Sequence, residues 1–478
     1  MVIRRWLLVL VFLLLPFQAG AVRLPYTENP PTPAPISSAV MTAMAAATPD
    51  EFIPVIVHLG TSQNLLNLPQ SRPERQQELI QRLQSASQQS RLALEPWLYA
   101  SRQQNLTSNP TFFWSINALA LQATPLAIQQ MALLPQVRSI SLDAEYLLPE
   151  PLAHSPTDEP NLLQIHANYA HALGWDGFGV VVASLDTGVS YTHPDLVSRW
   201  RGGTNSWFDP YGQHDTPYDP TGHGTGVMGL MVGGDAGGTS IGLAPGARWI
   251  SAKIFNDAGI ARTSAIHAAL QWILDPDGDP ATTDTPHILN NSWGGLVPGC
   301  DTEFQPDLQV LLAAGILPIF SAGNLGPAAA SNASPANLPE AFSVGGVDSS
   351  DQVSLSSSRG PSRCTPEAIF PNLAAPAENI RSSERSGLYG AFSGTSFAAP
   401  HAAGLLALIL QAYPSLTPAQ QRQALLAAAE DITPPGPDND TGVGRLDARV
   451  GFLWLWYNLG QPVPLPVHIF LPLIQNAQ

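Results

Sequence analysis

The second half of the chain alternates between short apolar runs and stretches whose apolar residues recur every three or four positions. Continuous runs rich in Val, Ile and Leu predict buried strands, and the recurring pattern predicts helices. The predicted strands are 179–185, 248–255, 287–293 and 316–322, and the predicted helices are 263–274 and 306–314. This alternation is typical of a doubly wound parallel α/β sheet with right-handed crossovers.

A further helix is predicted after the Ser-Gly-Thr-Ser sequence at 393–396. It runs to Ala412 with almost no polar face, so it should be buried. Pro400 is expected in its first turn, where backbone N–H groups have no intrahelical partner. Ser396 then lies beside free N–H donors and the positive end of the helix dipole. A serine in this place is either an N-cap residue or a nucleophile whose attack generates an oxyanion.

The first part of the chain predicts a separate small α+β domain over residues 51–148. Its expected elements are a strand at 52–59, a helix at 73–95, strand structure within 112–122, a helix at 125–134 and a strand at 136–143. This order approximates the split β-α-β, or ferredoxin-like, arrangement. Residues 22–50 are rich in Pro, Thr and Ala and are interpreted as a linker, and 149–162 as an exposed junction.

Both ends of the chain have a targeting interpretation. Arg4 and Arg5 precede an apolar run at 6–17 and small residues at 19–21, which is typical of a secretory signal peptide over 1–21. The run is too short to span a membrane, although an uncleaved anchor is the alternative. Prolines in the apolar tail, 451–478, exclude a transmembrane helix, and a covering strand and a cell-surface sorting tag both stay open. We expect a secreted protein without a transmembrane segment in the mature chain.

The composition of the chain limits the classes of molecule that it is expected to bind. With 478 residues, a net charge of −16 and 12% charged residues, the chain is expected to form two domains and to bind neither nucleic acid nor anionic membranes. Its two cysteines, Cys300 and Cys364, could form one disulfide in an exported protein, but the sequence cannot show that they meet. Two cysteines alone do not form a zinc site. We expect a monomer.

Three polar residues occupy places suited to catalysis. Asp186 follows the strand 179–185, at the carboxyl end where open α/β sheets put functional groups. His223 lies between glycines at a helix start, and Asn324, after a strand and Gly323, offers an amide donor to an oxyanion. Taken alone, each also has an ordinary structural interpretation. A single Asp-Thr-Gly in an α/β setting argues against an aspartic protease.

Together, Asp186, His223, Asn324 and Ser396 follow the order Asp, His, Ser within motifs similar to those of the subtilisin-like serine proteases. From Ile165 to about Ala448 the chain resembles this family, closest to bacillopeptidase F-like secreted members, which implies a catalytic domain over 163–450. The resemblance implies that Ser396 attacks the scissile carbonyl, His223 transfers the proton, Asp186 orients the imidazole and Asn324 binds the oxyanion.

The resemblance also implies a role for the small domain and for the segments that bind substrate. The small domain resembles an I9-like propeptide, which would assist folding, occupy the cleft and be cut away; a permanently attached domain is the alternative. Protein or peptide substrates are expected to contact two strand ends, at Ser292, Trp293, Gly294, Ser321, Ala322, Gly323 and Leu325. The backbone at 292–295 suits strand addition, and Leu325 would favour large apolar side chains over basic ones.

No cofactor is expected for the chemistry, but family members often carry structural calcium. Asp275, Asp277 and Asp279 have the oxygen density of a calcium loop, although the glycine is misplaced for an EF-hand. A solvated acidic turn is the favoured interpretation, and Asp438 and Asp440 are weaker candidates still. Many relatives also have a second histidine where this chain has Gly226.

Three other functions fit the sequence less well. An inactive relative that only binds peptides is disfavoured by the intact set of catalytic residues. A sedolisin-like peptidase would have Glu in place of His223 and would act in acid. A lipase or esterase would need a Gly-x-Ser-x-Gly elbow, which does not occur in a suitable place.

Overall fold

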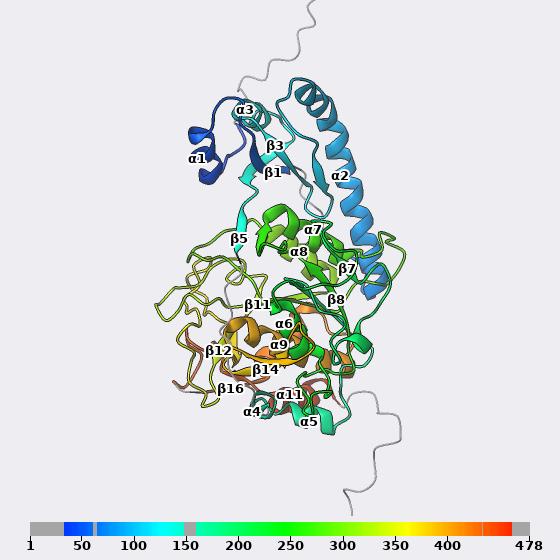
Figure 1. Cartoon of the computed structure of the whole chain (residues 1–478), viewed down its shortest axis with the longest axis vertical. Coiled ribbons are helices and arrows are strands. Elements are labelled where there is room, and N and C mark those ends of the chain that lie inside the picture. The colour runs from blue at the N-terminus through cyan, green and yellow to red at the C-terminus, as the bar shows by residue number, and fades with distance from the viewer. Residues whose placement is uncertain (1–32, 61–64, 148–158, 433, 461–478) are drawn as a thin grey trace, which may run out of the picture.

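The computed structural model of the chain describes residues 33–60, 65–147, 159–432 and 434–460. The expected signal peptide (1–21), residues 149–158 of the expected junction and residues 461–478 of the expected tail lie outside this part of the chain. Residues 159–162, expected to be the end of an exposed junction, instead pack on the large domain, with Glu159, Asn161 and Leu162 buried. The described residues form two domains stacked along the long axis of the molecule (Figure 1). The small domain ends with β5 (Glu145–Leu147), and the large domain begins with α4 (Pro160–Gln164).

The small domain is built on a four-stranded antiparallel sheet. Along the chain its elements are β1 (Ile53–Leu59), α2 (Arg72–Gln103), β2 (Thr111–Phe113), β3 (Ala118–Ala123), α3 (Pro125–Ala132) and β4 (Val137–Leu142). The strands lie in the order β2-β3-β1-β4. This β-α-β-β-α-β order is the ferredoxin-like arrangement that the sequence predicts.

Two helices of the small domain differ from the prediction. The helix predicted at 73–95 continues to Gln103 past Pro96, because Leu94 and Leu98 on either side of the proline are buried in the domain core. The expected linker contains α1 (Ser38–Ala46), which is capped by Ser37 and has a fully buried Val40. A composition rich in Pro, Thr and Ala therefore does not exclude a packed helix.

The large domain has a nine-stranded sheet in the order β16-β17-β13-β12-β11-β10-β6-β8-β7. All neighbouring strands are parallel except β16 and β17. Their bounds are β6 (Val181–Asp186), β7 (Trp207–Phe208), β8 (Arg248–Lys253), β10 (Ile288–Asn291), β11 (Leu317–Ser321), β12 (Phe342–Val347), β13 (Leu373–Pro376), β16 (Ala429–Glu430) and β17 (Arg445–Leu446).

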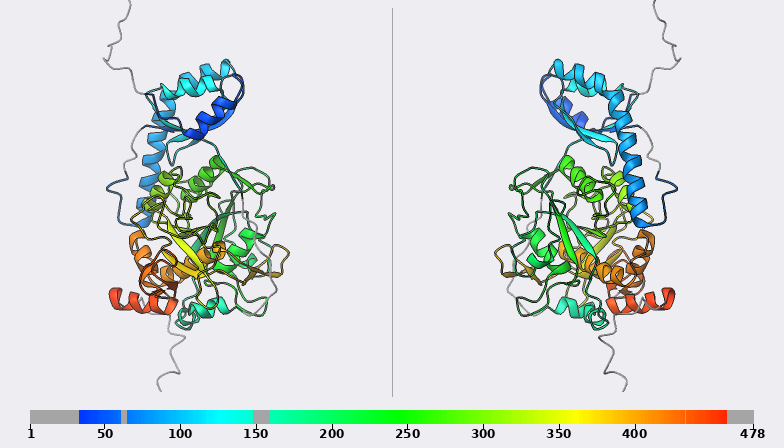
Figure 2. Two further views of the ribbon diagram at one scale, coloured as in Figure 1. Left: turned by 90° about the vertical axis from the view of Figure 1, so that its left-hand side faces the viewer. Right: turned by 90° about the vertical axis from the view of Figure 1, so that its right-hand side faces the viewer.

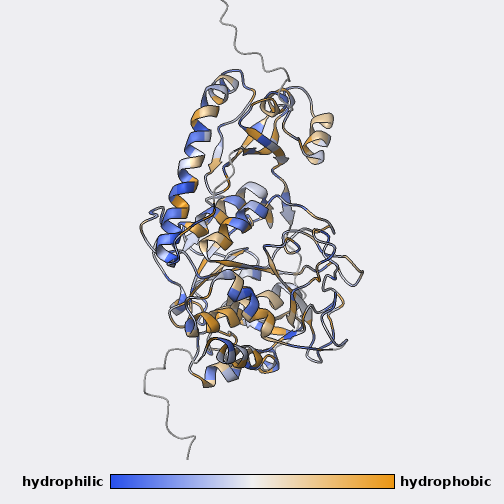
Figure 3. Ribbon diagram, turned by 180° about the vertical axis from the view of Figure 1, so that it is seen from behind, coloured by the Kyte–Doolittle hydropathy of each residue, from blue (hydrophilic) through white to orange (hydrophobic). Residues whose placement is uncertain are grey.

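Helices cover both faces of this sheet, which confirms the doubly wound α/β prediction. On one face the core contains α6 (His223–Val232) and α9 (Thr395–Ala412), and on the other α7 (Thr263–Leu274) and α8 (Gln305–Ala314). Helix α9 is predominantly apolar (Figure 3). Among the described residues it is the one helix long and apolar enough to cross a membrane, but 94% of it is buried inside the protein, as expected for a core helix.

The other elements lie at the margins of the large domain. Helices α5 (Ala167–Ala172) and α11 (Ala448–Leu459) pack at the end away from the small domain (Figure 2). Helix α10 (Pro418–Ala427) packs against α11. A hairpin of β14 (Ile380–Ser383) and β15 (Tyr389–Phe392) lies beside α6, and a short 3-10 helix covers Val197–Arg199.

The structure corrects one predicted boundary and defines one bond that the sequence left open. The expected domain end at 450 falls inside α11, whose Phe452 and Leu455 are buried in the core, so the first part of the expected tail belongs to the domain. Cys300 and Cys364 are joined by a disulfide, with their Cα atoms 4.9 Å apart.

Candidate active site

Asp186 and His223 form a buried pair at the carboxyl end of the parallel sheet. Asp186 is the last residue of β6, and His223 is the first residue of α6. His223 Nδ1 lies 2.7 Å from Asp186 Oδ1. Because the carboxylate only accepts, Nδ1 carries the proton and Nε2 is the free base. Both side chains are almost completely buried, at 0% and 2% exposure.

Glycines allow this close approach. A Cβ on Gly224, the residue after His223, would lie 2.2 Å from Gly188 O and 3.0 Å from Asp186 Cβ. Gly222, before the histidine, has a φ of 93°, which side-chain-bearing residues rarely adopt. The small residues around His223 are therefore required by the geometry of the pair.

The pKa of His223 is raised above its ordinary value by the balance of two effects. Burial lowers this pKa, but the charge and the hydrogen bond of Asp186, together with the charge of Asp219, raise it by more. The protonated imidazole is thus favoured, as a proton acceptor in a catalytic step requires.

Ser396 is the second residue of α9, and only 6% of it is exposed. Its Oγ donates to Ser292 O at 3.3 Å, and Ser292 Oγ donates to Ser396 O at 2.8 Å. The ring of His223 packs edge-on against Phe397, with ring centres 5.7 Å apart, so the imidazole lies beside the start of α9. No hydrogen bond joins the described side chains of Ser396 and His223 in this geometry.

The sequence predicts Pro400 in the first turn of α9, but this prediction is wrong: Pro400 is the sixth residue of the helix. An ordinary residue there would donate its N–H to the carbonyl of Ser396, four positions earlier. The proline has no N–H, and Ser396 O instead accepts the hydroxyl of Ser292. The serine's own backbone is in this way tied to the end of β10.

Asn324 lies opposite the start of α9. Its Oδ1 accepts hydrogen bonds from Thr395 N at 3.0 Å and Thr395 Oγ1 at 2.9 Å. This fixes the amide so that Nδ2, the donor, is turned away from Thr395. A Cβ on Gly394 would come within 3.2 Å of Nδ2, so the glycine keeps the space beside this donor open.

The residues predicted to bind substrate flank these groups. Ser292, Trp293 and Gly294 follow β10, and Ser321, Ala322, Gly323 and Leu325 end or follow β11, the parallel neighbour of β10. Trp293 is buried, and its indole N–H donates to Asn291 Oδ1. Gly323 N donates to Thr395 Oγ1, and Leu325 N donates to Ser358 Oγ. These hydrogen bonds hold the segment after β11 in place, as that of Trp293 holds the segment after β10.

Space around Gly226 is already filled. A Cβ there would lie 3.1 Å from Phe397 and 3.2 Å from Phe392, two rings that stack with centres 4.7 Å apart. The aromatic pair takes the place that a histidine would need.

The acidic residues gather differently from the prediction. Asp275 and Asp277 lie together with Asp284, rather than Asp279, with one carboxylate oxygen of each within 4.8 Å of the others. Burial and the neighbouring carboxylates raise the pKa of Asp275 to about 6. Asp277 accepts a hydrogen bond from Thr282, and Asp284 accepts one from Asn205.

The other acidic candidates have structural partners. Asp438 accepts from the backbone of Asp440 and Thr441, and Asp440 pairs with Arg359.

Two parts of the site were missed by the sequence analysis. Strand β9 (Ile260–Arg262) follows the end of β8 and pairs with β5 of the small domain. Its three residues are too few for a periodic pattern. Asp219, four residues before His223, makes contacts with the residues around the pair, and only its turn-like Asp-Pro-Thr-Gly setting could have indicated this.

Comparison with known proteins adds independent findings. The family model described as "Subtilase family" matches residues 177–444. Bacillopeptidase F of Bacillus subtilis (strain 168) is 32% identical over 439 residues, covering 84% of this chain but only 30% of the relative. Subtilisin E of the same organism is 31% identical, covering 66% of this chain and 76% of the relative. Serine protease AprX of the same organism is 31% identical, covering 70% and 79%.

Proposed function

This chain belongs to the subtilase family of serine endopeptidases, and we propose that it hydrolyses peptide bonds in proteins with Ser396 as the nucleophile. The observation that carries the proposal is the buried Asp186–His223 pair beside Ser396 at the start of α9, with the amide of Asn324 fixed opposite.

The proposed reaction follows from the chemistry of these groups. Ser396 Oγ leaves its contact with Ser292 O, gives its proton to His223 Nε2 and attacks the scissile carbonyl carbon. The imidazolium, stabilised by Asp186, then protonates the leaving amine, and water hydrolyses the acyl-enzyme by the reverse proton transfers. Asn324 Nδ2 and the backbone N–H of Ser396 donate to the oxyanion.

We propose that the small domain is a propeptide that blocks the site in cis. Strand β5 pairs antiparallel with β9, and its Tyr146 ring lies 6.2 Å from that of Trp293, the neighbour of Ser292. Asp143, just before β5, accepts from the backbone and hydroxyl of Ser264 at the start of α7. These contacts support entry of the chain into the site by strand addition, just before the expected junction.

Primary specificity and location are also proposals. We propose a preference for large apolar side chains on the N-terminal side of the scissile bond. The reason is that Leu325 and the segments 292–294 and 321–323 contain no acidic residue that could pair with a basic side chain. A peptide library that gave strict Arg or Lys preference would reject this. We propose secretion, supported by the sequence of residues 1–21; attachment to the cell surface through the tail is the alternative.

The test is expression of the wild type and of Ser396→Ala, with Ser349→Ala, an exposed serine, as the matched control. Intact mass and casein hydrolysis are measured for each. We expect the wild type and the control to yield an active fragment that begins between Pro149 and Leu163, and Ser396→Ala to stay full length and silent. A folded Ser396→Ala variant with wild-type casein hydrolysis would overturn the proposal.

A further inference from the structure

Asp219 is a buried carboxylate next to the catalytic pair but outside it. Only 3% of the residue is exposed, and hydrogen-bond donors surround both of its oxygens. Oδ1 accepts from Thr187 Oγ1 (2.9 Å), Thr221 N (3.0 Å), Thr221 Oγ1 (3.3 Å) and Gly222 N (2.9 Å), and Oδ2 accepts from Thr225 N (2.9 Å) and Thr225 Oγ1 (2.6 Å).

These donors belong to the two segments that carry the pair. Thr187 directly follows Asp186, and Gly222 directly precedes His223. Thr187 Oγ1, which donates to Asp219, also accepts from Gly224 N at 2.9 Å. One carboxylate thus links the end of β6 to both sides of the histidine. Asp219 is in this way hydrogen-bonded to the residues next to Asp186 and His223, whose side chains lie 2.7 Å apart.

The charge of Asp219 is not neutralised by a cation. In the described parts of the chain, no ion pair includes Asp219. The charged groups that face His223 are Asp186 from β6 and Asp219 from the loop before α6. Arg385, on the β14–β15 turn, packs its carbons near Gly222 and donates to Pro220 O. The hydrogen bonds of a turn do not require a charged acceptor. A nearby negative charge, however, stabilises a protonated imidazole such as that of His223.

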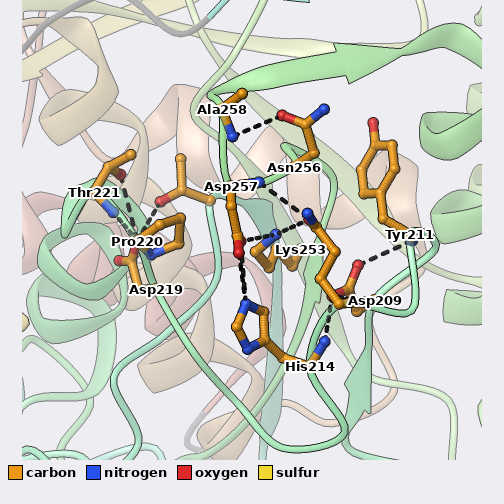
Figure 4. A network of polar contacts seen from close by, with 12 residues as sticks. Asp209, Tyr211, His214, Asp219, Pro220, Thr221, Lys253, Asn256, Asp257 and Ala258 are labelled. Carbon is orange, nitrogen blue, oxygen red and sulfur yellow. Dashed lines mark hydrogen bonds and ion pairs between the residues drawn. The ribbon is translucent and has the colours of Figure 1, made fainter.

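The loop that carries Asp219 is anchored at its other end (Figure 4). Lys253, fully buried at the end of β8 and in register with Asp186, pairs with Asp257 at 2.9 Å and donates to Gln213 at 3.0 Å. His214 contacts the same Asp257 at 3.0 Å. Through these contacts the loop 209–221 is attached to the end of β8. The attachment restricts the position of Asp219 relative to Asp186 and His223.

We propose that Asp219 is a positioning residue of the catalytic pair, which orients Asp186 and His223 through Thr187, Gly222 and Thr225 and stabilises the protonated imidazole by its charge. This inference rests on the proposed function. It assigns a role in the reaction to a residue that never touches the substrate.

The primary test is Asp219→Asn, which keeps the shape but removes the charge and turns one acceptor into a donor facing Thr225. We expect kcat to fall by about 100-fold, as for misplacement of a catalytic group by about 1 Å, with KM unchanged. We also expect the midpoint of the rising limb of kcat/KM against pH to move to lower pH, because a neighbouring negative charge is lost. Asp348→Asn, a surface carboxylate that likewise accepts backbone N–H groups, should change neither quantity.

A second pair of variants keeps the test decisive if Asp219→Asn does not fold. Thr187→Val removes the hydroxyl that joins Asp219 to Gly224 N, and Thr187→Ser keeps it. We expect Thr187→Val to lower kcat without a change of KM, and Thr187→Ser to restore it. A generally destabilised protein would not show this rescue at temperatures where both variants are folded.

Wild-type kcat and an unmoved pH midpoint in folded Asp219→Asn would overturn the proposal. If that variant is unfolded, equal kcat for Thr187→Val and Thr187→Ser would overturn it. Ser396→Ala is measured alongside: if it is silent while these variants behave as wild type, only the role of Asp219 fails. If Ser396→Ala remains active, the proposed function itself fails.

Discussion

A proline and two serines determine how Ser396, the proposed nucleophile, is held. Because Pro400 cannot donate to Ser396 O, that carbonyl binds Ser292 Oγ, and Ser396 Oγ in turn donates to Ser292 O. Ser396 is therefore tied to the end of β10 through both its backbone and its side chain. The structure shows the serine in this contact, from which it must turn to His223 for reaction.

Asn324 gives the first prediction at this scale. Asn324→Ala removes the side-chain donor to the oxyanion, so we expect kcat to fall by about 100- to 1,000-fold with little change in KM. Steady-state kinetics on a peptide anilide measure both. Asn324→Asp is the control for folding, since it retains an acceptor for Thr395 but also lacks the donor. An Asn324→Ala enzyme with wild-type kcat would exclude this role.

The second prediction concerns pH. The neutral imidazole is the active base, and the pKa of His223 is raised by Asp186 and Asp219 against the effect of burial. Activity should therefore be lost as the pH falls, with a midpoint above the ordinary histidine value of about 6.5. The measurement is kcat/KM from pH 4 to 10. An optimum in acid would instead support the sedolisin-like alternative.

The residues proposed for catalysis could be selected from the sequence because each lies in a short motif of small residues at a strand or helix end. The role of Asp219 could not, since its function depends on contacts with Thr187, 32 positions earlier in the chain. The disulfide was undecidable for the same reason: 64 positions separate Cys300 and Cys364.

At the scale of elements, apolar patterns predicted four adjacent strands of the sheet, β6, β8, β10 and β11, and the helices α7, α8 and α9. The sequence did not indicate the other strands of the large domain, among them the six-residue β12 and the short β9. Strand β9 has three residues and owes its extended form to pairing with β5. The sequence predicts α2 but ends it at residue 95, because a proline such as Pro96 would break an isolated helix. In the folded protein, burial of Leu94 and Leu98 offsets the cost of the proline. In each case a tertiary contact decides the structure.

Helix α2 also yields the third prediction. Its first half reaches along the large domain, where Arg72 donates to Pro286 O at 2.5 Å and Leu79 and Leu83 join the core. Arg72→Ala should weaken this attachment and shorten the lag before casein hydrolysis begins after the junction is cut. Arg102→Ala, which affects a contact to Glu95 within the small domain, should leave the lag unchanged. Equal lags for the two variants would show that α2 does not retain the small domain.

At the scale of the whole molecule, the two domains share a buried charged cluster. His267 of α7 contacts Glu303 at 3.2 Å and Asp307 at 3.0 Å, and His58 of the small domain contacts Glu303 at 3.0 Å. Burial lowers the pKa of His267, but the charge and hydrogen bonds of Asp307 and Glu303 raise it to about 10.

The fourth prediction follows from this cluster. The folded pKa of His267 lies above the unfolded value of about 6.5, so its contribution to stability is complete below that pH and is lost as the pH rises toward 10. The free energy of unfolding of full-length Ser396→Ala should fall across this window. Introducing His267→Gln into that chain should reduce the pH dependence. Identical slopes for the two chains would contradict the assignment.

The most direct test of the central claim is covalent labelling of the processed enzyme by a serine-directed organophosphorus fluoride, followed by peptide mass spectrometry. We expect one label, on Ser396, in step with loss of casein hydrolysis, and no label in His223→Ala. Complete inhibition with the label on another residue, and none on Ser396, would contradict it.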